Sequence, residues 1–369
     1  MKITVIGGGN IGTLMAAEMA AKGHEVTVFS SRPDKWAQNI EVFAADDKKI
    51  LTGTVLYVTS DLAAAVADAE MIWVTQPAQA LQKLGAQLEP CVSAGQMIGV
   101  VPGSGGAEFA FKGLLEKGCV LFGLQRVHSI ARLKEYGRAV YMLGRKKELQ
   151  LGSIPAEAAV KISSIVEKIF DMPCIPLPNY LCVTLTPSNP ILHTTRLYSM
   201  FNDYKVGISY EKNFLFYEEW TDEASRMLIA CDRELQDVCH AIPMDLKSVK
   251  SLKLHYESAT AEAMTAKIRG IEAFKGLTSP MKQTINGWVP DFESRYFVAD
   301  FSYGLKIIKD MARLFEVETP HIDEVWSWYE EVSEDRNFFS LDYSDKAEFV
   351  QLYHATNRDE LGASSIIQP

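Results

Sequence analysis

This chain of 369 residues lacks two features that would suggest a membrane or nucleic-acid function. No apolar run approaches the roughly 20 residues that cross a bilayer, and the run from Ile3 to Ile6 is too short for the core of a signal peptide. Positive charge is also scarce, because 37 basic residues stand against 47 acidic ones and give a net charge of −10. Such a balance disfavours nucleic acids and anionic membranes as partners. We therefore expect a cytoplasmic protein.

Cysteine is equally sparse and follows no recognisable pattern. The six cysteines form no C-x-x-C pair and no zinc-like spacing, and they lie among apolar residues. Reduced core cysteines in a reducing compartment are the natural interpretation, and we expect no metal site. The length is sufficient for two domains with separate cores. The sequence does not decide the oligomeric state, and a homodimer is compatible with it.

What the chain does contain is an apolar strand, residues 2–6, that runs directly into a glycine turn. The spacing of Gly7, Gly9 and Gly12 is that of a dinucleotide fingerprint. The first glycine allows a tight turn, the second a close approach to a pyrophosphate, and the third close packing of helix on strand. The helix that follows directs its free N–H groups at the phosphates. A second strand at residues 25–29 completes the unit, so the chain is predicted to bind a dinucleotide.

The end of this second strand carries no carboxylate. An NAD site usually has Asp or Glu there to bind the ribose 2′-hydroxyl, whereas this chain has Ser30, Ser31 and Arg32. Hydroxyls and a guanidinium suit a 2′-phosphate, so NADP(H) is favoured over NAD(H). The alternative is that Arg32 is an ordinary surface residue. The predicted cofactor-binding residues are Gly7, Gly9, Asn10, Ile11, Gly12, Ser31, Arg32, Thr75 and Gln76.

Strands and helices alternate up to a proline cluster at residues 176–178, and long amphipathic helices follow. The apolar run 71–74 indicates a strand buried on both faces, and Thr75 and Gln76 lie at its carboxyl end, where open parallel sheets bind ligands. The predicted fold is α/β plus all-α. A Rossmann domain with a doubly wound parallel sheet spans residues 1–180, and a helical C-terminal domain for substrate binding and catalysis spans residues 181–369.

Two segments of the second half carry candidate catalytic groups. In residues 186–193, Asn189 is a suitable N-cap and Pro190 suits the first helical position. His193 then lies in the opening turn of a helix, where we expect it to face the interdomain cleft and exchange protons near neutral pH. In residues 294–305, an Arg and an Asp lie among aromatics. Arg295 is suited to bind a substrate carboxylate, and Asp300 to orient the histidine.

Each of these assignments has a structural alternative. Asp300 could simply cap the helix that begins near Gly304, and His193 could be a buried histidine with satisfied hydrogen bonds. Residues 125–128 and Arg132 follow a strand of the first domain and could bind anions, but ordinary surface positions are favoured for them.

The fingerprint, the segment Asn-Pro-Ile-Leu-His ending at His193 and the segment Arg-Tyr-Phe-x-x-Asp-x-x-Tyr-Gly-Leu from Arg295 together resemble the octopine/nopaline (opine) dehydrogenase family. The similarity runs from Met1 to about Tyr329. It implies an NAD(P)H-dependent reductive condensation of an amino acid amine with a 2-oxo acid, and a catalytic pair formed by His193 and Asp300. Thr194 departs from the family, which often has proline there.

Two other functions remain open at this point. One is a 2-oxo acid reductase resembling ketopantoate reductase, which would use a Lys/Glu arrangement for which Lys205, Glu211 and Lys212 are the available residues. The other is a non-enzymatic NADP-binding sensor. The sequence does not indicate which amino acid or 2-oxo acid is used. The tail at residues 362–369 is polar and is expected to be loose.

Overall fold

The computed structural model describes residues 1–334 and 338–354. The chain divides into two compact units. The first consists of Met1–Thr184 together with the described residues from Phe349 onward, and the second is Leu185–Glu348. In the described part of the chain, no helix combines the length and the apolar character that crossing a membrane requires.

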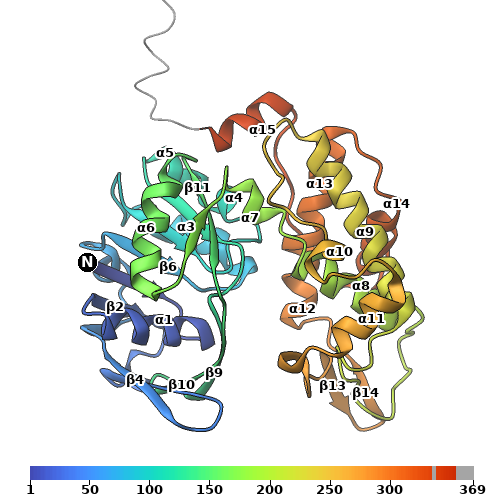
Figure 1. Ribbon diagram of the computed structural model, residues 1–369, viewed down its shortest axis with the longest axis horizontal. Helices are drawn as coiled ribbons and strands as arrows, with labels where there is room; N and C mark the ends of the chain where they lie inside the picture. The colour runs from blue at the N-terminus through green and yellow to red at the C-terminus, as the bar shows by residue number, and fades with distance from the viewer. Residues whose placement is uncertain (335–337, 355–369) are drawn as a thin grey trace, which may run out of the picture. The chain divides into compact units, whose positions relative to one another are not determined.

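An eight-stranded sheet is the centre of the first unit (Figure 1). Its strand order is β12-β11-β8-β7-β6-β1-β2-β5, and every neighbouring pair is parallel except β11 with β8. The strands are β1 (Lys2–Ile6), β2 (Glu25–Phe29), β5 (Tyr57–Thr59), β6 (Met71–Val74), β7 (Met97–Val100), β8 (Val120–Leu124), β11 (Leu149–Ile154) and β12 (Cys174–Pro176). All four residues of β6 are buried, as predicted for a strand covered on both faces.

The chain winds outward from β1 in both directions, which confirms the predicted doubly wound topology. Since crossovers between parallel strands are right-handed, reversing the winding direction puts the connecting helices on the opposite face. One face carries α1 (Asn10–Ala21) and α6 (Ala158–Phe170), which contact each other. The other carries α2 (Leu62–Val66), α3 (Leu81–Leu88), α4 (Ala107–Ala110) and α5 (Lys112–Glu116). Asp61 caps α2, accepting from the Ala64 N–H at 3.1 Å.

A second, four-stranded sheet packs on the outer side of α1, and the sequence analysis missed it. Its order is β4-β3-β10-β9. The strands are β3 (Asn39–Phe43), β4 (Lys49–Thr54), β9 (Ser129–Glu135) and β10 (Ala139–Arg145). Several side chains on these strands face solvent, and β3 pairs with β10, which lies far away in the chain. Local apolar patterning indicates a strand at residues 139–143, but it cannot show that such distant segments pair into a sheet.

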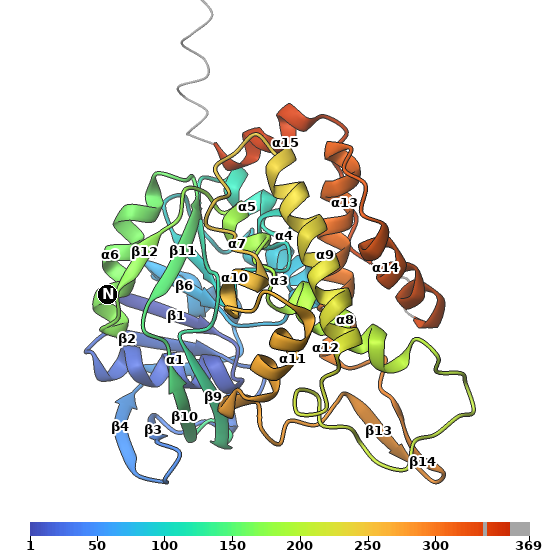
Figure 2. The same cartoon turned by 45° about the vertical axis from the view of Figure 1, so that its right-hand side comes forward.

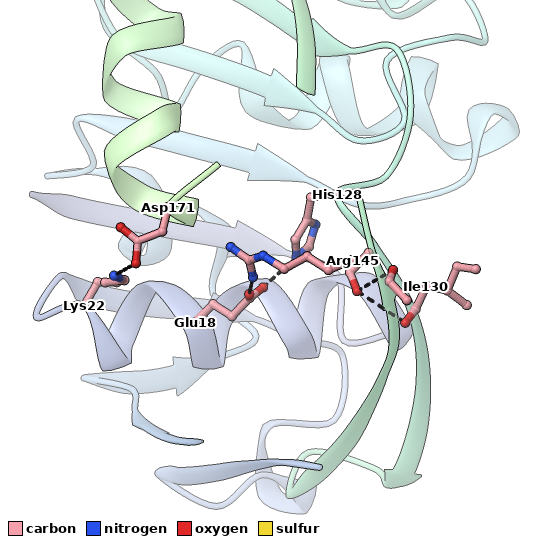
Figure 3. A network of polar contacts seen from close by, with 8 residues as sticks. Glu18, Lys22, His128, Ile130, Arg145 and Asp171 are labelled. Carbon is pink, nitrogen blue, oxygen red and sulfur yellow. Dashed lines mark hydrogen bonds and ion pairs between the residues drawn. The ribbon is translucent and has the colours of Figure 1, made fainter. Parts of the chain in front are cut away.

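A buried polar network ties α1 to this second sheet (Figure 3). The carboxylate of Glu18 lies 2.6 Å from Nε2 of His128 and accepts from Nη1 of Arg145 at 2.8 Å. Glu18 and His128 are both buried. The expectation that residues 125–128 lie on the surface is therefore wrong for His128. It is also wrong for Gln125, which is buried and donates to the Cys182 carbonyl at 2.8 Å.

The second unit is mainly helical, as predicted (Figure 2). The helix α9 (Asp222–Ala241) contacts most of the others and is capped by Thr221, which accepts from the Ala224 N–H at 3.2 Å. The remaining elements are α8 (Asn189–Phe201), α10 (Leu252–His255), α11 (Ala261–Arg269), η3 (Glu272–Phe274), β13 (Met281–Thr284), β14 (Gly287–Pro290), α12 (Arg295–Val298), the π-helical turn η4 (Phe301–Leu305), α13 (Lys306–Phe315) and α14 (Pro320–Val332).

The structure differs from the predicted domain range 181–369 at both ends. The helix α7 (Leu181–Thr184) belongs to the first unit. The part of α15 (Lys346–Tyr353) from Phe349 onward also belongs to the first unit. The ring of Phe349 stacks on that of Phe109, with the two centroids 6.3 Å apart. The amphipathic pattern alone could not show that either segment belongs to the first unit. The tail at residues 362–369 lies outside the described residues.

Glu108 joins three segments of the first unit. Because its carboxyl group is buried, we expect the stability of the protein to depend on pH. Its buried carboxyl accepts from Thr184 Oγ1 at 2.5 Å and from Tyr353 Oη at 3.0 Å. Burial raises its pKa from 4.5 to about 7. Between those pH values the folded state holds a proton that the unfolded state has lost, so stability falls as pH rises.

We therefore expect the free energy of unfolding to fall by up to about 3 kcal/mol between pH 4.5 and 8, at about 1.4 kcal/mol for each unit of raised pKa. Glu108→Gln keeps the shape without the ionisation and should lack this contribution, whereas Asp232, whose pKa burial also raises to about 7, titrates in both proteins. Urea titrations at several pH values measure both proteins. A constant difference in stability between them across this range would contradict the assignment.

Candidate active site

The glycine turn lies where β1 ends, between its neighbours β2 and β6, at the point where the winding direction of the sheet reverses. Ligands of open parallel sheets bind at such a position. Gly7 has φ of 118°, and a Cβ atom at Gly12 would overlap the Gly7 carbonyl oxygen. The Thr75 hydroxyl donates to the Ile6 carbonyl at 3.2 Å, so Thr75 lies against the turn. Gln76 follows and is half-buried.

The turn has the features that a pyrophosphate requires. A Cβ atom at Gly9 would meet no atom within 4 Å, so the space in front of this residue is open. The first turn of α1 has neither a side-chain cap nor an acidic residue, and its N–H groups are available for an anion. Ile11 packs on the core from this first turn. The Asn10 side chain accepts from the Leu133 N–H at 2.8 Å and anchors the turn to β9.

The end of β2 is built differently from what the sequence suggested. Ser30 is buried, and its hydroxyl contacts Trp36 Nε1 at 3.2 Å and Tyr136 Oη at 3.0 Å. Ser31 and Arg32 are exposed, and the Arg32 guanidinium lies 4.0 Å above the centre of the Tyr136 ring. Tyr136 comes from the turn between β9 and β10, so no local pattern could assign it to this place.

In the second unit, His193 and Asp300 meet as predicted. Nδ1 of His193 lies 2.7 Å from Oδ2 of Asp300, and the histidine is only 7% exposed. His193 is the fifth residue of α8 rather than part of its opening turn. The predicted cap is wrong by one residue, because Ser188 occupies the N-cap position and Pro190 is the second helical residue. Proline is tolerated there because the first four N–H groups of a helix have no partner within it.

The close packing of η4 on the start of α8 brings the two residues together. A Cβ atom at Gly304 would lie 3.1 Å from the ring of Pro190, so the glycine allows the backbone of η4 to approach α8. Asp300 directly precedes η4 and makes no side-chain capping hydrogen bond there. The alternative that Asp300 is only a helix cap is therefore wrong, since its carboxylate is directed at His193.

Tyr217 completes the surroundings of the imidazole, and sequence reasoning missed it. Its hydroxyl lies 2.9 Å from Nε2 of His193. A carboxylate only accepts hydrogen bonds, so Nδ1 carries the proton toward Asp300 and the neutral Nε2 accepts from Tyr217. Burial raises the pKa of Tyr217 above its ordinary value. The one available signal was the aromatic-rich run from Phe214 to Trp220.

Arg295 lies in the same neighbourhood. It is exposed, and its guanidinium lies 5.9 Å from the centre of the Tyr296 ring. Its positive charge lowers the pKa of the Tyr217 hydroxyl and so opposes the effect of burial. The Tyr296 ring in turn lies 4.8 Å from that of His193. A carboxylate bound by Arg295 would thus be held near the His193 site.

The residues that a Lys/Glu mechanism would need are not arranged as a site. Lys205, Glu211 and Lys212 are exposed, and Lys212 pairs with Glu219 at 2.5 Å. All six cysteines are free. Residues 1–334 and 338–354 contain no group of three or more histidine, cysteine or acidic side chains that could hold a metal ion.

Two family models match the chain. One describes the NAD/NADP octopine/nopaline dehydrogenase alpha-helical domain and matches residues 176–333. The other describes the NAD-dependent glycerol-3-phosphate dehydrogenase N-terminus and matches residues 2–144.

Curated relatives and a solved structure agree with the first model. Opine dehydrogenase of Haliotis discus hannai is 28% identical over 364 residues, covering 89% of each chain. Octopine dehydrogenase of Mizuhopecten yessoensis is 26% identical over 359 residues, covering 90% of each. The structure of an octopine dehydrogenase with NADH and agmatine superposes with a TM-score of 0.80 at 25% identity, covering 90% of this chain and 89% of that one.

The chain resembles the octopine and nopaline (opine) dehydrogenase family over most of its length, as the sequence predicted. It is therefore an enzyme, an NAD(P)-dependent oxidoreductase of the class that acts on CH–NH donors, and the sensor alternative is set aside. The predicted combination of a Rossmann domain with a helical domain is confirmed by the fold.

The glycine turn predicts that two similar substitutions both weaken cofactor binding but differ in their effect on the melting temperature. Gly9→Ala adds a methyl group where the protein has open space, at a φ of −82° that alanine adopts freely. We expect an unchanged melting temperature but a dissociation constant for NAD(P)H raised at least about tenfold, because the methyl group occupies the pyrophosphate position.

Gly12→Ala is the matched comparison. It forces a methyl group into the Gly7 carbonyl, so it should lower the melting temperature and weaken cofactor binding together. Thermal unfolding and fluorescence titration with NADPH measure both effects. Normal cofactor affinity in Gly9→Ala would show that the pyrophosphate lies elsewhere.

Proposed function

We propose that this enzyme condenses the amine of an amino acid with a 2-oxo acid and reduces the resulting imine, using NAD(P)H. The observation that carries the proposal is the buried pair of His193 and Asp300, 2.7 Å apart, in the unit that matches the opine dehydrogenase helical domain. The relatives named opine and octopine dehydrogenase support the substrate class. Solved octopine dehydrogenase structures with NADH and L-arginine or with NADH and agmatine, both 25% identical to this chain, support it as well.

Proton balance gives His193 its task. An amino acid arrives with a charged ammonium group, which must lose a proton before its nitrogen attacks the oxo carbon. The resulting carbinolamine then needs one proton so that its hydroxyl departs as water and leaves the protonated imine. A single group that takes the first proton and returns it in the second step satisfies both needs, and an imidazole is suited to this exchange near neutral pH.

Asp300 supports both protonation states of that imidazole. In the neutral state its carboxylate keeps the proton on Nδ1 and leaves Nε2 free to accept one. In the protonated state it stabilises the imidazolium charge. Because the pair is almost completely buried, this charge interaction is screened far less than one at the surface.

The remaining residues bind and orient. Both substrates carry a carboxylate, and Arg295 is suited to hold one of them through paired N–H donors. Gly7, Gly9 and Gly12, with the first turn of α1, would hold the pyrophosphate, with Thr75 and Gln76 beside them. The bound nicotinamide supplies a hydride to the imine carbon. This proposal requires the nicotinamide end of the cofactor, bound by the first unit, to reach His193 in the second.

The end of β2 favours NADP(H) over NAD(H) as part of this proposal. Ser31 and Arg32 are exposed there, and Asp34 is the first carboxylate to follow. The ring of Tyr136 supports the Arg32 guanidinium at a distance typical of a cation–π contact. A guanidinium held this way loses less side-chain entropy when it binds a phosphate.

A screen of NADPH oxidation with pairs of amino acids and 2-oxo acids tests the function. We expect turnover only when both substrates are present, with a product mass equal to their sum minus water plus two hydrogens. Each 2-oxo acid alone is the control. Turnover with an oxo acid alone, giving a hydroxy acid, would favour the reductase class. Absence of turnover with every pair would reject the proposal.

Arg32→Ala tests the cofactor preference. We expect kcat/KM for NADPH to fall roughly 10- to 100-fold, which corresponds to the loss of a charge-assisted contact worth about 1.5–3 kcal/mol. The value for NADH should change little, because NADH lacks the 2′-phosphate. Lys83→Ala removes an exposed charge from α3 and serves as the control for net charge. Equal losses with both cofactors would exclude Arg32 as a phosphate ligand.

Substitutions of the His–Asp pair test the proton transfer. His193→Ala and His193→Gln should lower kcat at least about 100-fold, the usual range for loss of general acid–base catalysis. NADPH affinity, measured by fluorescence titration, should stay near that of the unmodified enzyme, because the fingerprint lies in the other unit.

Asp300→Asn should also lower kcat, because an amide cannot stabilise imidazolium and can present the wrong hydrogen-bond partner. The double variant should be little worse than His193→Ala alone, since groups that act as a unit are not additive. Additive losses, with a normal kcat in Asp300→Asn, would remove Asp300 from the mechanism.

A further inference from the structure

Both nitrogens of the His193 imidazole are already occupied within the protein. Nδ1 faces Asp300, and Nε2 lies 2.9 Å from the hydroxyl of Tyr217. The nitrogen that the proposed chemistry needs for proton exchange is therefore covered by a phenol. His193 and Tyr217 are both buried. A proton that reaches or leaves Nε2 in this arrangement has to pass the Tyr217 oxygen.

Tyr217 is held firmly in this position. Arg196 lies one turn after His193 in α8 and is itself buried. Its Nε donates to the Phe216 carbonyl at 2.9 Å and its Nη2 to the Glu219 carbonyl at 2.8 Å, on either side of Tyr217 in the chain. The helix that carries the histidine therefore also anchors the segment that carries the tyrosine.

Ring contacts complete the positioning. The ring of Phe274 stacks on that of Tyr217 with centroids 4.0 Å apart, and the Trp220 ring runs parallel to it at 6.3 Å. The hydroxyl is thus fixed from the backbone side by Arg196 and from the ring faces by aromatics. A group fixed on so many sides is suited to transfer a proton in a defined direction.

The electrostatic surroundings keep the phenol neutral. Burial raises the pKa of Tyr217, the nearby Tyr296, Tyr256 and Asp300 add to this effect, and the Arg295 charge opposes it. A neutral hydroxyl donates and accepts at the same time. It can therefore receive a proton on one side and release its own on the other without becoming charged.

We propose that Asp300, His193 and Tyr217 form one proton path and that the Tyr217 hydroxyl, rather than the imidazole, exchanges the proton with substrate. The inference deepens the proposed function and rests on it. When the carbinolamine loses water, the Tyr217 O–H proton moves to the departing oxygen while the Nε2 proton of imidazolium moves to the Tyr217 oxygen. The products are water, the protonated imine (iminium ion), which accepts the hydride, and neutral His193. Deprotonation of the substrate ammonium follows the same path in reverse.

Tyr217→Phe removes only the hydroxyl and keeps the stacked ring. We expect the single-turnover rate of NADPH oxidation to fall at least about tenfold, with KM for both substrates within about threefold. The matched control is Tyr198→Phe, a substitution on α8 of a tyrosine whose hydroxyl donates to Glu324 at 2.6 Å. That variant should keep the rate of the unmodified enzyme. A Tyr217→Phe enzyme that keeps the full single-turnover rate would overturn the inference.

A proton inventory in mixtures of H2O and D2O provides a measurement that a merely structural role would not change. Two protons move together along the proposed path. A plot of the single-turnover rate of the unmodified enzyme against the deuterium fraction should therefore be curved rather than straight. With Tyr217→Phe one transfer is lost and the dependence should become linear. A linear dependence in the unmodified enzyme would overturn the inference.

Arg196→Lys tests the positioning of the tyrosine. Lysine keeps the charge but cannot donate to both carbonyls with the guanidinium geometry, so the single-turnover rate should fall. Combined with Tyr217→Phe, it should add little further loss, because both changes interrupt one path. Fully additive losses would show that Arg196 acts independently of Tyr217 and would overturn this part of the argument.

Nitrogen NMR of the substrate-free protein separates this inference from the proposed function. The His193 signals should show a proton on Nδ1, and Tyr217→Phe should shift the Nε2 signal because its hydrogen bond is lost. An unchanged Nε2 signal would overturn the proton path even if opine synthesis is observed. An enzyme that shows the expected signals but turns over no substrate pair would reject the proposed function, and the path with it.

Discussion

The burial of the Asp300 carboxylate beside His193 is the constraint around which the second unit is organised. A buried carboxylate needs a partner, because an uncompensated charge in the interior costs several kcal/mol. His193 is that partner, and the contact exists only because Gly304 lets η4 approach Pro190. The same helix then anchors the Tyr217 segment through Arg196. One packing contact between two short segments thus sets the geometry of every group that could move a proton.

The first unit follows a comparable logic around α1. This helix lies between two sheets, so its polar residues cannot remain unpaired. Glu18 is compensated by His128 and Arg145 (Figure 3), and Asn10 accepts from the backbone of β9. The second sheet therefore stabilises the helix whose N-terminus is suited to bind phosphates. Its β9–β10 turn also brings Tyr136 to Arg32, the residue that we propose to bind the 2′-phosphate of NADP(H).

The chemistry we propose is divided between the two units. The groups suited to hold a hydride donor lie in Met1–Thr184, and the groups suited to transfer protons lie in Leu185–Glu348. Such a division explains how one cofactor domain can serve different reactions, because the second unit alone decides where protons go. It also explains why the N-terminal part of this chain matches a glycerol-3-phosphate dehydrogenase model while the helical part matches the opine dehydrogenases.

The sequence by itself determined the features that depend on neighbouring residues. The glycine spacing, the buried strand β6, the caps at Asp61 and Thr221 and the change to long helices all follow from local patterns. The pairing of His193 with Asp300 was also predicted, through a resemblance that spans most of the chain. Only the tertiary structure decided that Tyr217 covers Nε2 and that Tyr136 supports Arg32. These contacts join residues far apart in the chain, where packing rather than local propensity selects the partner.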